Sequence, residues 1–563
     1  MKILQAKASN YRNIDGISVF FNEATSYIIG DNEIGKTNFL ELLKTVCDGD
    51  GFRDSDFRDP EKPIIVELAV KAHPNEQGPF GTGFDERIRF KQKISESHPE
   101  VSAPALRKTL KARSRMPISF LSYTAKDNKD MLKGAGILLS LIIDKYFASD
   151  DKGELQNILP PFFDGFLGSI GDFTELEAAI TVKTAEMIKS LMPEKSHMPA
   201  EKFTRLRSVA SVSLLSEINK LYASKAVPFS SRLYPDEGDM LTLPLAFAID
   251  EPEIHLHPYM QRTLISHYTR ILNNEDEQFL ELLKVCFGVD RIDGQLIIVT
   301  HSTDSLVGDY RNLIRFYRHN AKTAVVSGSD AKVSFEPKIE KHIIMRFPEI
   351  KEAFYANCAL LVEGETEYGC IEAFASKLGV SLDENGICLI NARGEGSIRP
   401  LRQLLKAFRL PSAAIYDGDV KLGNTASSSQ FYTKEPCFEM EIAAKLFDNN
   451  KQSLAMHIAL EIDPVAARAP INMNAIGKPL RKLGLDASSE SPGYISKPLS
   501  EVDVSSRDEF CIMLSAFLMT KKGVFLGRTI GEALSASDIP DSYVRAIKNA
   551  VELANKAYDG TVL

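Results

Sequence analysis

One segment, GDNEIGKT at residues 30–37, limits the fold of this 563-residue chain more than any other feature. It matches the pattern G-x-x-x-x-G-K-[ST], follows the apolar residues YII and opens TNFLELLKTVC, whose apolar residues have helical spacing. A strand, a loop with glycines and a helix in this order predict a phosphate-binding loop. We expect its N–H groups and the helix N-terminus to surround the phosphates of a nucleotide, with Lys36 reaching the β and γ phosphates and Thr37 binding Mg²⁺.

A later segment, LAFAIDEPEIHLHP at residues 245–258, supplies the complement to this loop. Its apolar strand ends in Asp250, which we expect to hold Mg²⁺ through water, and the adjacent Glu251 is placed to polarise an attacking water. The strand pattern IIVTHS ends at His301, whose imidazole we expect to contact the γ phosphate. The predicted nucleotide site therefore comprises Gly30, Asn32, Gly35, Lys36, Thr37, Asn38 and Asp250.

His255 and His257 alternate in a way that suggests a metal site. The sequence offers no evident third ligand, so packing or hydrogen bonding in the loop after the strand is the favoured interpretation.

Length and composition limit the remaining possibilities. The length predicts two or three domains, and no apolar run reaches the length of about 18 residues that a membrane span needs. The N-terminus shows no secretory signal, so we expect a cytoplasmic protein.

Cysteines and charge exclude some classes of site. Seven scattered cysteines with no C-x-x-C pair indicate neither a disulfide framework nor a zinc site. The net charge of −9 argues against indiscriminate coating of nucleic acid. Two basic stretches, residues 106–115 and 399–409, are more typical of solvated helix faces.

The order of strand and helix patterns predicts an α/β protein with a helical insertion. Strand patterns occur before and after the phosphate-binding loop and return beyond residue 243, whereas residues 125 to about 225 have mainly helical spacing. Strands alternate with helices again from Tyr355, which predicts a small parallel sheet, and the chain beyond about residue 425 is mainly helical. The predicted domains are 1–124, the insertion 125–230, a return to the first domain at 231–350, and 351–563.

Acidic residues follow two strands of this predicted second sheet. In ALLVEGETE, Glu363 comes at the end of a strand and Glu367 one helical turn later. AAIYDGDV ends in Asp417 and Asp419, and Asp417 lies 54 residues (417 − 363) after Glu363. Because the carboxyl ends of parallel strands share an edge, we expect these carboxylates to converge. They need a counter-charge, and oxygen ligands favour Mg²⁺ or Mn²⁺.

The motifs NYRNI, GDNEIGKTN, AIDEPEIHLHP and VTHS resemble the ABC-type ATPase heads of the SMC, RecF and OLD (overcoming lysogenization defect) families. The resemblance implies that nucleotide is sandwiched between two protomers and that Asp56 lies in a loop contacting Mg²⁺. The second protomer's signature is reduced here to SSRLYPDEGDMLTLP, in which Gly238 takes its place. We therefore expect ATP to bind but to turn over slowly.

The acidic motifs resemble the Toprim domain of topoisomerases, primases and OLD nucleases, which has a Glu, a Gly and then Asp-x-Asp in this order. The glycine is Gly394 or Gly396. OLD nucleases add an acid, here Glu439 or Glu441, and a lysine, here Lys521 or Lys522. The resemblance implies two metals that activate water and stabilise the leaving oxygen, with the lysine neutralising the scissile phosphate.

An ATPase head followed by a Toprim domain is the arrangement of the OLD family, and IGKTNFL and the length look closest to the large subunit of the Gabija anti-phage system or to a retron effector. The resemblance implies a metal-dependent endonuclease for double-stranded DNA, assembled as a dimer or tetramer through its ATPase heads and regulated by ATP. It also implies a partner such as a helicase-like subunit, or a reverse transcriptase with its msDNA, and no membrane.

Two other functions compete with this interpretation. One is a DNA-structural ATPase of RecF or SMC type whose Toprim-like domain only binds DNA, although the insertion is too short for SMC arms. The other is a strand-passing enzyme, which needs a nucleophilic tyrosine. Tyr416 lies beside the Asp pair, but a strand position explains it better.

Overall fold

The computed structural model describes residues 1–78, 81–82, 85–103, 110–111, 118–124, 199–224, 227–254, 256–419, 429–470 and 497–560. Most of the predicted insertion, most of the basic stretch 106–115 and His255 lie outside these residues. The chain forms two compact units, one of residues 1–317 and 322–333 and the other of 318–321 and 334–563. Each unit is described by itself below.

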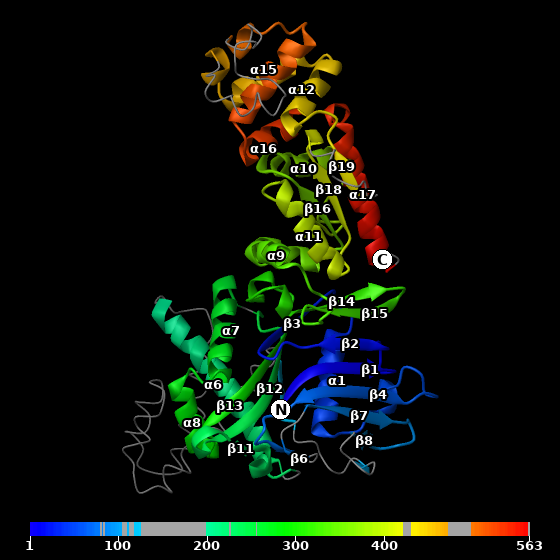
Figure 1. Ribbon diagram of the computed structural model, residues 1–563, viewed down its shortest axis with the longest axis vertical. Helices are drawn as coiled ribbons and strands as arrows, with labels where there is room; N and C mark the ends of the chain where they lie inside the picture. Colours follow the sequence, from blue (N-terminus) through cyan, green and yellow to red (C-terminus); the bar gives the residue numbers. More distant parts are fainter. Residues whose placement is uncertain are drawn as a thin grey trace, which may run out of the picture. The chain divides into compact units, whose positions relative to one another are not determined.

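A seven-stranded sheet organises the first unit, in the order β10-β12-β13-β3-β14-β15 with β11 paired to β12 (Figure 1). The pairs from β10 through β14 are parallel. β12 is buried along all but its first residue, which explains its nearly continuous apolar sequence. The strands are β3 (Thr25–Ile29), β10 (Phe120–Thr124), β11 (Tyr234–Pro235), β12 (Leu241–Asp250), β13 (Arg291–Val299), β14 (Leu313–His319) and β15 (Lys322–Ser327).

An antiparallel sheet of order β2-β1-β4-β7-β8-β9 forms the other layer of this unit. Apolar residues alternate along it, so that one face is buried over α1 (Lys36–Asp48) and the other is open. Its strands are β1 (Lys2–Ser9), β2 (Ile17–Phe20), β4 (Ile64–Lys71), β7 (Asp85–Gln92), β8 (Glu100–Ser102) and β9 (Leu110–Lys111), and a separate pair is β5 (Gln77–Gly78) with β6 (Gly81–Thr82).

A buried glutamine joins the two sheets of the first unit. Gln295 of β13 accepts a hydrogen bond from the Ile3 amide at 2.9 Å and donates to the carbonyls of Ile3 at 2.8 Å and Asn22 at 3.0 Å. All its polar atoms are therefore used, which removes the cost of burying an amide.

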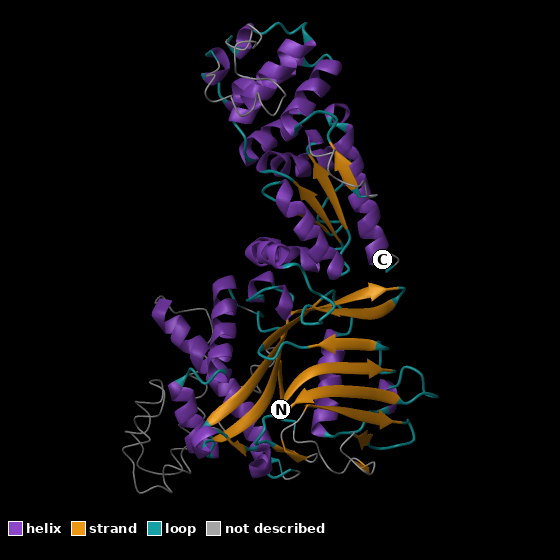
Figure 2. Cartoon of the chain, in the orientation of Figure 1, coloured by secondary structure: helices purple, strands orange, loops and turns teal. Residues whose placement is uncertain are grey.

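Helices cover the larger sheet of the first unit (Figure 2). The described helices are α6 (Pro199–Ala223), α7 (Pro258–Leu272) and α8 (Glu277–Phe287), with short 3₁₀ turns η1 (Asp54–Asp56), η3 (Phe229–Arg232), η4 (Glu237–Asp239), η5 (Thr303–Ser305) and η6 (Tyr310–Asn312).

The second unit contains a four-stranded sheet of order β17-β16-β18-β19 in which every pair is parallel. Its strands are β16 (Cys358–Val362), β17 (Ile387–Asn391), β18 (Ser412–Tyr416) and β19 (Gln430–Tyr432). β16 lies between β17 and β18 and is buried throughout. The expected small parallel sheet is thus confirmed.

Helices surround this sheet and continue beyond it, and α17 packs along β16 and β18 (Figure 1). The helical segments are α9 (Pro337–Ile350), η7 (Lys351–Tyr355), α10 (Glu365–Lys377), α11 (Glu395–Ala407), α12 (Phe438–Asp448), α13 (Gln452–Ile462), η9 (Ala466–Arg468), η11 (Leu499–Glu501), α15 (Arg507–Thr520), α16 (Val524–Ala533), η12 (Ala536–Asp538) and α17 (Asp541–Tyr558).

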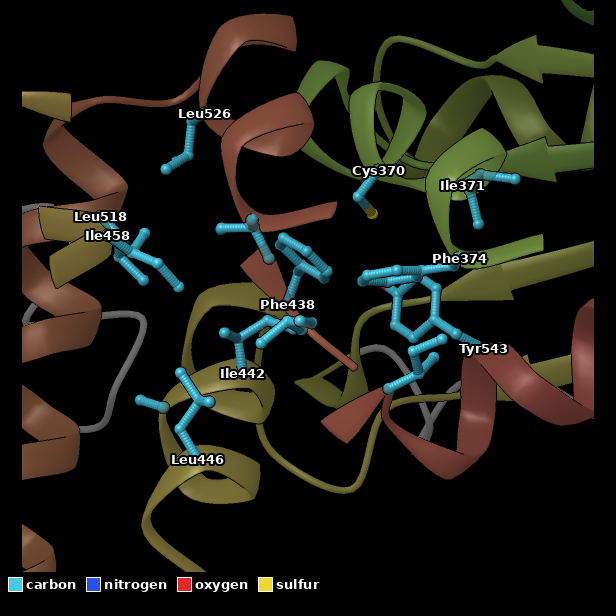
Figure 3. Close-up of a cluster of buried hydrophobic side chains, with 14 of the residues drawn as sticks. Cys370, Ile371, Phe374, Phe438, Ile442, Leu446, Ile458, Leu518, Leu526 and Tyr543 are labelled. Atoms are coloured by element: carbon cyan, nitrogen blue, oxygen red, sulfur yellow. The ribbon is translucent and has the colours of Figure 1, made fainter. Parts of the chain in front are cut away.

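One apolar core joins these helices to the sheet. Figure 3 shows Phe374 of α10, Phe438 of α12 and Tyr543 of α17 packed against one another. Each large side chain buried in this way stabilises the fold by about 1.5–3 kcal/mol. The core therefore fixes α10, α12 and α17, which come from distant parts of the sequence, around the end of the sheet.

The predicted fold class is confirmed: an α/β unit with a phosphate-binding loop, followed by a parallel-sheet unit with helices toward its C-terminus. None of the helices in the described ranges is long and apolar enough to cross a membrane.

Candidate functional site

Two carboxylates meet at the C-terminal edge of the small parallel sheet. Glu363 follows β16 and Asp417 follows the neighbouring β18, and the Asp417 amide donates to Glu363 Oε2 at 3.4 Å. The Phe438 amide, at the start of α12, donates to Asp417 Oδ1 at 3.1 Å. This contact places the Asp417 carboxylate at the N-terminus of α12, where the helix dipole stabilises negative charge.

Gly418 separates the two acids of the Asp-x-Asp motif because no side chain fits there. A Cβ at this position would lie 2.4 Å from the carbonyl oxygen of Glu435, and the Gly418 amide donates to Thr433 Oγ1 at 2.8 Å. On either side, Asp417 is buried and Asp419 is exposed.

A third and a fourth carboxylate of this cluster are also buried. Glu367, on the first turn of α10, is 6% exposed, and Glu439, on the first turn of α12, is completely buried. Burial raises the pKa of Glu367 to about 8, and the negative charges of Asp417 and Glu439 add to the effect. Lys522 opposes it, because its Nζ lies 3.1 Å from Glu439 Oε1. The cluster therefore has fewer cations than carboxylates.

The other acid and lysine considered from the sequence have different partners. Lys521 Nζ donates to Asp463 Oδ2 at 2.6 Å. Glu441 Oε2 accepts from the amides of Lys434 and Glu435, both at 2.8 Å. Of each pair, Glu439 and Lys522 therefore lie with the acidic cluster, whereas Glu441 holds the loop before α12.

Close packing of α10 against α16 brings Lys522 to the cluster. A Cβ on Gly527 would lie 1.9 Å from the Thr366 carbonyl oxygen, and one on Gly369 would lie 2.4 Å from that of Val524. The Gly523 amide also donates to Thr366 Oγ1 at 3.2 Å. The glycines let the two backbones touch where Lys522 precedes α16. No spacing in the sequence indicates this contact.

The two candidate glycines of the motif also differ. The Gly394 amide donates to the carbonyl oxygen of Glu363 at 2.7 Å, and its φ of +120° is a conformation that favours glycine. Gly396 lies inside α11, where a Cβ would meet open space. Gly394 is therefore the one that contacts the cluster.

Tyr416 is buried at the end of β18 and stacks on Tyr432.

Across the described residues, no three His, Cys, Asp or Glu side chains are grouped closely enough to hold an ion as they stand. The donors at the edge of the sheet nonetheless fit a divalent cation, because they are all carboxylate oxygens and Glu367 is buried with like charges around it. A cation here would relieve that repulsion.

The phosphate-binding loop adopts the expected strand–loop–helix arrangement. Gly30 has φ +140°, and a Cβ there would lie 2.3 Å from the Phe316 carbonyl oxygen; Gly35 has φ +110° and is the N-cap of α1. Lys36 Nζ donates to the carbonyl oxygens of Gly30 and Asp31, both at 2.7 Å. Burial lowers the pKa of Lys36 to about 8, against the attraction of nearby acids. Asn32 is exposed in the loop.

The magnesium residues predicted from the sequence lie beside this loop. Thr37 Oγ1 donates to Asp250 Oδ2 at 3.3 Å, and Asp250 is buried. Glu251, with φ +53°, has its Oε1 3.7 Å from His301 Nε2. The structure therefore brings Thr37 to Asp250, and Glu251 to His301.

Glu253 also belongs to this network, although no motif considered above assigns it a role. Its carboxylate accepts from the His301 amide at 2.6 Å and from Thr300 Oγ1 at 2.9 Å. Its place in the acidic run DEPE, opposite VTHS on the neighbouring strand, is the signal that indicates it. His257, by contrast, precedes α7 and stacks on Tyr259.

Arg12 is a second functional candidate that was not predicted, although it lies in the motif NYRNI. Its Nη1 donates to Asn38 Oδ1 at 2.7 Å and its Nε to Asp56 Oδ1 at 2.8 Å, and it also pairs with Glu41. The structure therefore holds Asp56 against Arg12 and links it to Asn38, next to Thr37.

Two family models match the chain. One, described as "Overcoming lysogenization defect protein-like, TOPRIM domain", matches residues 354–419, which contain Glu363, Asp417 and Asp419. The other, described as "AAA ATPase domain", matches residues 242–305, which contain Asp250 and His301.

Three curated relatives resemble most of the chain. The Old nuclease of Escherichia phage P2 is 20% identical over 502 residues, covering 74% of this chain and 77% of that protein. The OLD nuclease of Thermus scotoductus is 24% identical over 480 residues, covering 75% and 82%. The endonuclease GajA of Bacillus cereus is 23% identical over 454 residues, covering 70% and 71%.

Proposed function

We propose that this chain, which joins an AAA ATPase domain to an OLD-like TOPRIM domain, is a metal-dependent DNA endonuclease of the OLD family, governed by ATP and acting in anti-phage defence. The named nucleases among its relatives support the activity, and the endonuclease GajA supports cleavage within a strand.

One observation carries the proposal: several carboxylates and one lysine lie together where β16 and β18 end. They are Glu363, Glu367, Asp417, Glu439 and Lys522. Asp417 and Glu363 are joined by a hydrogen bond, and Glu367 feels the charges of Asp417, Glu439 and Lys522. A purely structural role does not account for burying several like charges with one cation, because each uncompensated charge costs free energy.

The residues of this cluster have different roles in phosphodiester cleavage. Glu363, Glu367, Asp417 and Asp419 would hold Mg²⁺ or Mn²⁺, which when bound supplies Lewis acidity and lowers the pKa of water. Glu439 holds Lys522 in place at 3.1 Å. Lys522 then offsets the negative charge that develops around the scissile phosphate.

ATP is the regulator in this proposal. Lys36 and the loop amides bind its phosphates, and Thr37 and Asp250 would hold the accompanying Mg²⁺. Glu251 and His301 lie beside these residues, where an attacking water and the γ phosphate are expected. The reduced signature around Gly238 suggests slow turnover, so that binding, more than hydrolysis, changes the cleavage rate.

The partners follow from the same resemblance. We propose double-stranded DNA as the substrate and a homodimer or tetramer assembled through the ATPase domains. A Gabija-like system with a helicase-like subunit is the favoured context, since an endonuclease GajA is among the relatives, and a retron is the alternative.

The test is cleavage of supercoiled and linear DNA by the full chain with Mg²⁺ or Mn²⁺, with and without ATP. Glu363→Ala and Asp417→Asn should abolish cleavage. Glu365→Ala is the matched control, because Glu365 is the exposed acid between the two cluster members Glu363 and Glu367. Cleavage that survives in both cluster variants would refute the assignment of the site.

The DNA-structural ATPase remains the rival function, and the same experiment separates the two. It predicts that DNA binds to the chain but that every metal and nucleotide condition leaves the DNA intact. Loss of cleavage in Glu363→Ala with unchanged DNA affinity would decide in favour of the nuclease.

A further inference from the structure

A pocket of about 580 Å³ opens on the outer face of the antiparallel sheet in the first unit. β1 and β2 line one part of it, and β15 with the loop that follows lines another. Its lining includes Gln5, Lys7, Ser18, Phe20, Arg87 and Lys332. Neither the phosphate-binding loop nor Asp250 contributes to this lining, so the nucleotide site does not account for the pocket.

The register of the strands explains why these side chains share one face. Gln5 of β1 pairs with Phe20 of β2 and with Ala69 of β4, and Ala69 pairs in turn with Arg87 of β7. Directly paired residues of antiparallel strands point to the same face, and Lys7, two residues after Gln5, points there too. The open face of the sheet therefore presents Lys7 and Arg87 together.

The charge of the lining is mainly positive. Lys7, Arg87 and Lys332 supply three cations, and Asp330 is the one acid in the lining. Asp330 Oδ1 accepts from the backbone amide of Lys332 at 3.0 Å. Within the described part of the chain, none of the three cationic side chains has an ion pair or a side-chain hydrogen bond.

One acid on the open face of the sheet, Glu67, already has a partner. Glu67 pairs in register with both Lys7 and Arg89, and its Oε1 lies 3.6 Å from Arg89 Nε. It therefore offsets the charge of Arg89 more than that of Lys7. The pocket therefore has an excess of positive charge, although the whole chain has a net charge of −9. Such a local excess favours the binding of an anion.

The spacing of the cations identifies the kind of anion. β4 separates β1 from β7, so Lys7 and Arg87 lie on strands about 10 Å apart. This is too wide for one phosphate group, but it suits phosphates one or two positions apart in one DNA strand, because their winding around the axis adds to the axial rise of about 3.4 Å per nucleotide. Phe20 adds an apolar surface suited to the deoxyribose.

We propose that this pocket receives the sugar–phosphate backbone of DNA, with Lys7, Arg87 and Lys332 each contacting a phosphate. The first unit thereby binds DNA through a surface of its own, separate from the acidic site. The inference goes beyond the proposed nuclease activity and holds whether or not the acidic site cleaves.

The test measures DNA affinity of the full chain against salt concentration, by fluorescence anisotropy of a labelled duplex. All proteins carry Glu363→Ala so that cleavage does not interfere. The pocket variant combines Lys7→Gln, Arg87→Gln and Lys332→Gln. The matched control combines Lys44→Gln, Lys93→Gln and Arg291→Gln, which removes two lysines and one arginine at exposed positions of the same unit outside the pocket.

The pocket variant should reduce the slope of log affinity against log salt by about 3, one for each lost phosphate contact, and should weaken binding near 0.1 M salt on the order of 100-fold. The control should match the parent. Each single variant should lower the slope by about 1, which keeps the test available if the triple variant fails to fold.

Two results would overturn the inference. One is an equal loss in the pocket variant and the control, which would indicate that only net charge matters. The other is binding of a fluorescent mononucleotide, in a Lys36→Ala background, that disappears in the pocket variant, since the pocket would then take a free nucleotide in place of the DNA backbone.

Discussion

At the residue scale, two lysines that are neighbours in the chain serve different partners. α15 ends at Thr520 and α16 begins at Val524, so Lys521 and Lys522 lie in the turn between helices and point in different directions. Lys522 reaches buried Glu439, and Lys521 reaches Asp463. Of this pair of lysines, Lys522 therefore lies at the acidic site, whereas Lys521 forms an ion pair with Asp463, which follows α13.

This difference makes a first prediction. Lys522→Ala should lower the rate of DNA cleavage by roughly 10²–10³-fold, the usual cost of removing a group that stabilises charge in the transition state. Lys521→Ala should change it by no more than about twofold, since a partly exposed ion pair contributes little. Single-turnover cleavage rates at saturating protein measure both, and equal losses would contradict the assignment of Lys522.

The raised pKa of Glu367 makes a second prediction, for protein in which EDTA has removed divalent cations. The unfolded carboxyl ionises near 4.5, whereas the folded one keeps its proton until about pH 8. Between these values the folded state binds more protons, so the free energy of unfolding falls as pH rises. At about 1.4 kcal/mol per pKa unit, the loss amounts to a few kcal/mol.

Chemical denaturation between pH 5 and pH 8, at about one-unit steps, measures this loss. Glu367→Gln should flatten the profile and should be more stable than the parent at the upper end, and exposed Glu365→Gln should follow the parent. Adding Mg²⁺ should restore stability mainly at the upper end, because the ionised carboxylate is the ligand. A parent profile that is flat in EDTA would contradict the burial argument.

At the scale of elements, the crossing of α10 and α16 decides where Lys522 can be. Gly369 and Gly527 let the two helices touch through their backbones, and Gly531 continues the contact, since a Cβ there would lie 2.9 Å from Ala373 Cβ. Three glycines at a helix crossing cost helical propensity. The gain is an approach that larger residues would prevent.

Gly527→Ala therefore makes a third prediction. Its added Cβ would meet the Thr366 carbonyl oxygen, so the second unit should lose about 1–3 kcal/mol of stability and cleavage should fall as Lys522 moves. Gly396→Ala is the control, because nothing lies near its Cβ position, and it should gain up to about 1 kcal/mol. Thermal unfolding and cleavage assays compare the two. A Gly527→Ala protein as stable as the parent would show that the helices can separate freely.

The sequence predicts the elements of this region well, but it does not predict their contacts. Apolar strands ending in Glu363 and Asp417 are enough to place the carboxylates at one sheet edge, because parallel strands share that edge. Neither the choice of Lys522 nor the role of Gly527 follows in the same way. Both depend on a contact between residues more than 150 positions apart, for which the local pattern carries no signal.

At the scale of the whole molecule, the chain divides its chemistry between two units. The first carries the phosphate-binding loop with Lys36, Thr37 and Asp250, and the second carries the acidic cluster. The boundaries of the predicted insertion, and the way in which protomers assemble around ATP, stay predictions. Nucleotide binding can therefore be altered without touching a single residue of the acidic site.

The fourth prediction uses this separation. ATP at about 100 times its Kd should stabilise the first unit by about 2.7 kcal/mol, and Lys36→Ala should remove this effect. The same variant should cleave DNA at a rate that no longer responds to ATP. Calorimetry with and without nucleotide measures the first effect, and cleavage assays measure the second. A cleavage rate that still responds to ATP in Lys36→Ala would refute control through this loop.

The place of β3 in its sheet has a consequence for synthesis on the ribosome. β3 pairs with β13 on one side and β14 on the other, so it gains its second neighbour only when Leu313 has emerged, 284 residues (313 − 29) after Ile29. At about 5–20 residues per second, roughly 15–60 s pass before this apolar strand has both of its neighbours. The nascent chain therefore needs protection from aggregation during that interval, and it acquires a nucleotide-binding site only when nearly all of the first unit has been translated.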